Sequence, residues 1–126
     1  MQRLEQIFEQ LGEEPEEEEC KGLSGLLEEL ETFTQEQDPS EDILDVVSIG
    51  AASKVESYEI CAYESLIGLA QDMGHTKAVK LLQQNLKEEE QTLKKMQGLS
   101  RKIKPEQSGM EEEEEPTRKR GSRRAA

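Results

Sequence analysis

The chain has no tryptophan, only two tyrosines and two phenylalanines, and an aromatic content of 3% over 126 residues. A β-sandwich of this size normally uses more aromatic and β-branched residues. A helical bundle can instead be built from leucine, isoleucine, valine and alanine. The shortage of aromatic side chains therefore favours an all-α fold.

Long apolar runs are also missing, and no stretch of the sequence is apolar enough to predict a membrane span. The polar, periodic segment from Met1 to Glu5 does not resemble a signal peptide. Cys20 and Cys61 are too few for a disulfide framework, and with a single histidine, His75, there is no zinc-type cluster. These features predict a soluble, cytoplasmic protein with reduced thiols and no membrane partner.

Basic residues are outnumbered: 16 lysines and arginines face 29 acidic residues, for a net charge of -13. An acidic surface repels phosphate, so no nucleic-acid partner is expected for the folded part. The same surface attracts cations, although the simplest interpretation of the charge is solubility.

Glycine and proline residues divide the chain into predicted helices. Gly12, Pro39, Gly74 and Pro105 interrupt helical patterns. The patterns predict helices over residues 1–11, about 17–35, about 41–73 and about 76–102. Residues 1–103 are predicted to form the folded domain, and the charged segment 104–126 is predicted to be a disordered tail.

The two longest predicted helices are joined only by a turn at Gly74 and His75, so they should pack as an antiparallel hairpin. In the first of them, helical spacing places Tyr58, Leu66, Leu69 and Met73 on one apolar face, which is expected to point inward. Each helix carries glutamate on its apolar face: Glu59 lies within the face of the first, with Glu56 at the border, and Glu89 is central to the stripe of the second. A carboxylate in an apolar core must be paired, protonated or bound to a metal. The alternative is that these side chains lie at an open end and stay solvated.

Several segments resemble one known family. Residues 54–63, K-V-E-S-Y-E-I-C-A-Y, resemble the K-V-E-H-Y-E-I-A-x-Y segment of the YciE/YciF ferritin-like family of bacterial stress proteins. Residues 20–27 and 3–12 resemble two further segments of that family, and Glu88-Glu89 continues the match. The resemblance covers residues 1 to about 100.

This resemblance implies a ferritin-like four-helix bundle with a dinuclear iron or manganese site and a ferroxidase-type or stress-protective role. Carried over by position, the possible metal ligands are Glu59, Glu89, Glu56 and Glu88, with Tyr58 and Tyr63 as hydrogen-bond donors beside them.

Departures from the family pattern affect this site. The family's first long helix has no counterpart, Ser57 stands at the family's histidine, and Leu93 stands at an acidic position. We therefore expect a truncated or degenerate family member with an incomplete bundle. It would bind Fe or Mn weakly, or no metal at all, and would not be an enzyme.

Two alternatives remain open at this stage. A homodimer of two half-bundles would bring Glu59 and Glu89 of both copies together and restore a ferroxidase-like site. Alternatively, the apolar helix faces left without partners serve self-association or another helical protein, without metal. His75 is expected to be a cap or surface residue.

Overall fold

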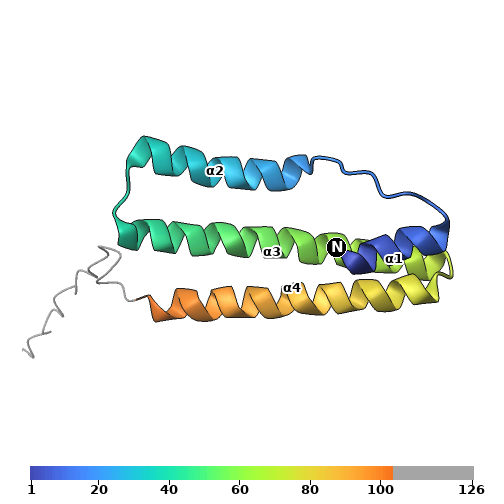
Figure 1. Ribbon diagram of the computed structural model, residues 1–126. Coiled ribbons are helices and arrows are strands. Elements are labelled where there is room, and N and C mark those ends of the chain that lie inside the picture. Colours follow the sequence, from blue (N-terminus) through green and yellow to red (C-terminus); the bar gives the residue numbers. More distant parts are fainter. Residues whose placement is uncertain (104–126) are drawn as a thin grey trace, which may run out of the picture.

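The computed structural model describes residues 1–103 and contains four helices in that range (Figure 1). They are α1 (Gln2–Leu11), α2 (Lys21–Gln37), α3 (Glu41–Asp72) and α4 (Thr76–Lys102). No strand occurs within these residues, so the prediction of an all-α helical bundle is confirmed. The predicted disorder of the segment 104–126 lies outside the described residues.

Helices α3 and α4 form the long antiparallel hairpin expected from the sequence (Figure 1). Gly74 adopts a left-handed backbone with φ 74°, which glycine does at little cost. The Gly74 N–H donates to the Gln71 carbonyl at 3.0 Å, and the His75 N–H donates to the Ala70 carbonyl at 2.9 Å. These bonds close α3, and His75 then occupies the N-cap position of α4.

Helix α2 begins at Lys21, four residues later than the sequence pattern indicates. Residues 13–19 are six glutamates and Pro15, so a helix there has almost no apolar surface to bury, proline disfavours it, and the adjacent glutamates repel one another. This acidic segment is instead an irregular linker between α1 and α2.

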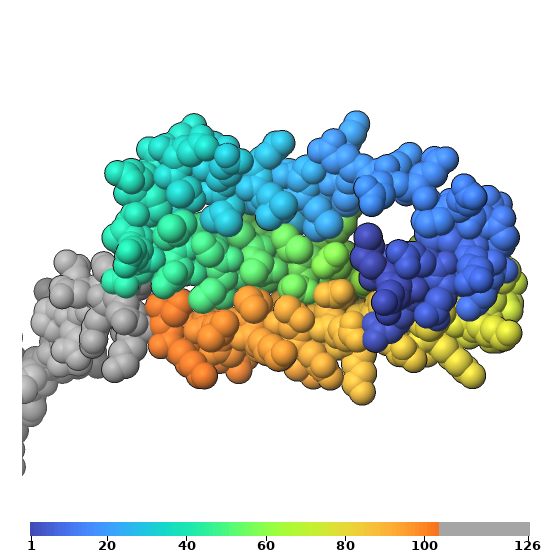
Figure 2. All heavy atoms as spheres, viewed as in Figure 1, coloured from blue at the N-terminus to red at the C-terminus, as the bar shows by residue number. Residues whose placement is uncertain are grey.

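The short helices each pack on one member of the hairpin. Helix α2 contacts α3, and α1 contacts α4 near the turn (Figures 1 and 2). The core at this end comprises Ile67 and Ala70 of α3 with Ala78 and Leu82 of α4, and no large side chain of the described part is fully buried. The helices therefore form an incomplete bundle with an open surface.

The face of α3 that packs on α4 differs from the one expected. Tyr58, Leu66, Leu69 and Met73 were predicted to point inward, but they are 43–60% exposed. The buried residues are Ile67 and Ala70. Apolar residues lie around much of this helix, so periodicity alone could not select the face that α4 covers.

Among residues 1–103, no helix is both long and apolar enough to cross a lipid bilayer.

Candidate metal centre

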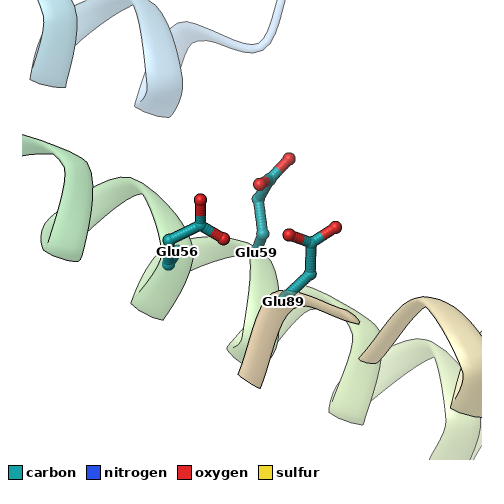
Figure 3. Close-up of side chains that lie close together, drawn as sticks. All are labelled: Glu56, Glu59 and Glu89. Carbon is teal, nitrogen blue, oxygen red and sulfur yellow. The ribbon is translucent and has the colours of Figure 1, made fainter. Parts of the chain in front are cut away.

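Three glutamates meet between the two long helices (Figure 3). Glu56 and Glu59 come from α3, and Glu89 comes from α4. Residues three apart on a helix lie on neighbouring positions of one face, so the first two carboxylates project together. One carboxylate oxygen from each residue lies within 4.8 Å of the others, and all three side chains are half-buried.

The electrostatics of this triad (Glu56, Glu59 and Glu89) are unfavourable when all three groups are ionised. Burial and the charges of Glu89 and Glu59 raise the pKa of Glu56 to about 7. Burial and the charge of Glu89 also raise the pKa of Glu59. A proton or a cation between these groups would relieve the repulsion.

Glu56 lies deeper than its predicted border position. Its Oε2 atom is buried and has no hydrogen-bond partner among the described residues. A buried acceptor without a partner is costly, and native proteins usually satisfy such atoms with a donor, a water molecule or an ion. This atom therefore favours an occupant within the triad.

The donor set suits one hard divalent cation. All ligand atoms are carboxylate oxygens, which Mg²⁺, Mn²⁺ and Fe²⁺ accept. Neither histidine nor cysteine belongs to this group within residues 1–103. His75 lies in the turn between the long helices, so the residues present do not supply the imidazoles of a dinuclear site.

Glu88, the fourth candidate ligand, is engaged elsewhere. Its Oε1 atom accepts a hydrogen bond from Arg3 Nη2 of α1 at 2.6 Å. This hydrogen bond lowers the pKa of Glu88 and raises that of Arg3. The structure thus brings Glu56, Glu59 and Glu89 together, while Glu88 joins α4 to α1.

Arg3 and Asn85 were not singled out from the sequence, yet they organise this region. Arg3 Nη1 donates to Asn85 Oδ1 at 2.7 Å, and Asn85 Nδ2 donates to the Tyr63 hydroxyl at 3.3 Å. Asn85 is only 6% exposed. One sequence signal was available: Asn85 lies one turn before Glu89, beside Leu82 and Leu86. A buried amide needs hydrogen-bond partners, so an asparagine on this apolar stripe indicates a polar contact.

The two tyrosines have different surroundings. Burial, followed by the charges of Glu89, Glu59 and Glu88, raises the pKa of Tyr63, although its hydrogen bond with Asn85 acts in the opposite direction. Tyr63 thus lies within electrostatic range of the triad.

Tyr58 is tied to α2 instead. The Cys20 thiol donates to the Tyr58 hydroxyl at 3.4 Å, and this contact lowers the pKa of Cys20 and raises that of Tyr58. Gly22 lies so close that an added Cβ atom would be 2.6 Å from the Tyr58 hydroxyl oxygen. The main role of Tyr58 in this structure is to contact the start of α2.

Comparison with known proteins agrees with the sequence resemblance. The family model described as "Domain of unknown function (DUF892)" matches residues 1–108. The curated protein YciF of Escherichia coli (strain K12) is 41% identical over 73 residues, which cover 58% of this chain and 43% of YciF. The chain thus matches less than half the length of that relative. Because the family model covers most of the chain and the chain is 41% identical to YciF over 73 residues, this chain belongs to the YciE/YciF-type family.

Proposed function

We propose that this YciF-related chain binds one divalent cation, Fe²⁺ or Mn²⁺, through Glu56, Glu59 and Glu89. The observation that carries the proposal is the buried Glu56 Oε2 atom, which has no partner in the described residues and belongs to a group of three close carboxylates. A bound cation would give the Oε2 atom a partner and reduce the repulsion among the three carboxylates.

The composition of the site favours weak binding. Three carboxylates supply enough charge for a hard cation, but without imidazole they give little preference for later transition metals. A bound ion would supply Lewis-acid or one-electron chemistry, and the role of the glutamates is to hold and orient it. We infer a ferritin-like metal binder of low ferroxidase activity, with residues 1–103 as its folded domain.

The family resemblance also supports a stress-associated role. Cys20 and Cys61 are free thiols on the surface, which suits the reducing cytoplasm. We therefore infer a cytoplasmic protein whose expression rises under stress, and transcript measurement after peroxide, salt or acid treatment tests that inference.

Metal titration tests the site directly. Metal-free protein titrated with Mn²⁺ under argon, with calorimetry and electron paramagnetic resonance detection, should take up one ion per chain. Glu59→Gln should weaken binding at least about tenfold, since one charged ligand is lost. Glu64→Gln is the matched control, because Glu64 is an exposed glutamate of the same helix.

Other results would contradict this assignment. Equal affinity in wild type and Glu59→Gln would exclude the triad as the site. Two tightly bound ions per chain, both lost on Glu59→Ala, would overturn the single-ion, low-activity assignment.

A second candidate function rests on the open surface. Only four apolar residues of the described part are buried, while Leu66, Leu69 and Met73 remain largely exposed. Such exposure favours self-association, and a homodimer that opposes two triads would assemble the carboxylates of a dinuclear site. Sedimentation velocity combined with Fe²⁺ oxidation measures this: a dimer without oxidation above background excludes the ferroxidase, and a monomer at all concentrations excludes self-association.

A further inference from the structure

The chain has two cysteines, one at the start of α2 and one in α3. Cys20 is the N-cap residue of α2, and its thiol contacts the Tyr58 hydroxyl of α3 at 3.4 Å. Cys61 follows Tyr58 by three positions, so the two residues are neighbours on one face of α3. Both cysteines therefore lie beside the same tyrosine.

The packing of α2 on α3 brings Cys61 to the side of Cys20. The two helices run antiparallel, and the residues of α3 that face α2 recur at helical spacing: Val47, Ala51, Lys54 and Tyr58 (Figure 1). The next position of this stripe is Cys61. Side chains of a helix lean toward its N-terminus, so the Cys61 side chain leans back toward the level of Tyr58, where Cys20 lies.

Electrostatics agree with this placement. A hydrogen bond with Cys20, followed by the charge of Cys20, burial and the charge of Cys61, raises the pKa of Tyr58. The Tyr58 hydroxyl is thus within electrostatic range of both sulfur atoms. Cys20 follows the irregular linker, so it can approach Cys61 without breaking a preceding helix.

The surroundings of Cys20 favour its thiolate form. Hydrogen bonds from the Tyr58 hydroxyl and from the backbone N–H groups of Leu23 and Gly22 lower the pKa of this thiol, although burial and the charge of Glu59 act in the opposite direction. Both cysteines are exposed, so a small oxidant can reach them from solvent. An accessible thiolate is the form of cysteine that peroxides oxidise.

We propose that Cys20 and Cys61 are a peroxide-sensitive thiol pair, which hydrogen peroxide converts to a disulfide between α2 and α3. The Cys20 thiolate attacks one peroxide oxygen, so an S–O bond forms as the O–O bond breaks, and the departing hydroxide takes up a proton to become water. The Cys61 thiol then attacks the sulfur of this sulfenic acid. An S–S bond forms as the S–O bond breaks, and the departing oxygen takes the Cys61 proton to give a second water. In all, the two sulfur atoms lose two electrons to the peroxide.

The disulfide changes how firmly α2 is held. In the reduced protein, exposed polar pairs such as Lys54 with Glu29 and Cys20 with Tyr58 join α2 to α3. A disulfide between Cys20 and Cys61 closes a loop that contains α2 and the first part of α3, so it restricts states in which α2 has left the hairpin. This site is separate from the triad and does not depend on metal binding.

Peroxide treatment of the reduced full chain, in metal-free buffer with a chelator, tests the proposal. Mass spectrometry without reductant should find a monomer that has lost two hydrogen atoms and contains joined Cys20 and Cys61 peptides. Dithiothreitol should reverse the change. In hydrogen exchange, the α2 amides should exchange at least about tenfold more slowly after oxidation, while the α1 amides keep their rates.

Cysteine variants test the two positions separately. Cys61→Ser should stop at the Cys20 sulfenic acid, which dimedone labels, whereas Cys20→Ser should form no intramolecular disulfide. The matched control combines Cys61→Ser with Leu66→Cys. It keeps two thiols but moves one of them roughly 140° around α3, at about 100° per residue, to another exposed position. This control should form no disulfide within the chain.

Three results would overturn the thiol pair. They are oxidation of the two thiols to separate sulfinic acids, a disulfide that joins two chains instead of two helices, and an equal yield of disulfide from the matched control. Unchanged exchange of the α2 amides after complete disulfide formation would exclude the effect on α2.

Discussion

Glu56 is a partly buried glutamate whose protonation is expected to be linked to folding. Its carboxyl group lies against Glu59 and Glu89, and its pKa is raised to about 7, well above the 4.5 of a solvated glutamate. A group whose pKa is higher in the folded state holds its proton more tightly there than in the unfolded chain. Folding and protonation of this site are therefore linked.

The sign of this linkage gives the first prediction. The contribution of Glu56 to stability is fully present below about pH 4.5 and is lost as the pH rises through about 7. In metal-free protein, Glu56→Gln should remove this loss of stability at high pH, because the glutamine amide is neutral at every pH. Urea denaturation at pH 5 and pH 8 should show the variant to be more stable than the wild type at pH 8.

General acidity of the chain produces a similar trend, so a control is needed. Glu64→Gln removes one exposed negative charge from the same helix. It should shift stability slightly and leave the slope between pH 5 and pH 8 unchanged. Equal slopes for Glu56→Gln and wild type would mean that Glu56 is solvated.

At the scale of the helices, polar contacts at their ends hold the short elements to the hairpin. Asn85 joins α4 to α1 through Arg3 and to α3 through Tyr63. Asn85→Leu should remove both bonds and leave Arg3 Nη1 and the Tyr63 hydroxyl without this partner, while Arg3 keeps its ion pair with Glu88. We expect it to lower the free energy of unfolding by about 1–3 kcal/mol, and the exposed neighbour Gln84→Leu to have little effect.

Two glycines of α2 offer a matched comparison. A Cβ atom at Gly25 meets nothing within 4 Å, whereas at Gly22 it would lie 2.6 Å from the Tyr58 hydroxyl. Gly25→Ala should stabilise the protein by about 0.5–1 kcal/mol through helix propensity.

Gly22→Ala should gain less than Gly25→Ala, because the exposed Tyr58 ring must move and break its contact with Cys20. Thermal denaturation measures both variants. A Tyr58→Ala background should make the two substitutions equivalent, and a persistent difference there would exclude the tyrosine as its cause.

For the molecule as a whole, the small core sets the stability. Leu82 is 5% exposed and packs with three other buried apolar residues. Leu82→Ala should cost about 2–5 kcal/mol, a large share of the 5–15 kcal/mol typical of a domain. Urea denaturation followed by circular dichroism should show this loss, while Leu27→Ala at a 58% exposed position should behave like the wild type.

The sequence predicted much of this architecture because its breaks are local signals. Gly12, Gly74 and the Pro39-Ser40 segment end or begin helices close to where the pattern indicates. The predicted start of α2 was wrong. A run of glutamates is compatible with a helical pattern, but repulsion between their charges can also prevent the helix from forming.

The candidate site was harder to predict, since it depends on how α4 is rotated against α3. Leu66 and Leu69 were predicted to be buried because they are apolar. The packing instead buries Ile67 and Ala70, and it also buries the Oε2 atom of Glu56. The pairing of Arg3 with Glu88 and Asn85 joins residues more than 80 positions apart, which no local pattern reveals.

The division of contacts, with α1 on α4 and α2 on α3, also bears on how cooperatively the chain unfolds. Each outer helix can leave the hairpin without disturbing the contacts of the other, so the two should open as independent units. Hydrogen exchange should then show separate opening free energies for α1 and α2, both below that of the α3–α4 hairpin. Asn85→Leu should lower the value for α1 and leave that for α2 unchanged.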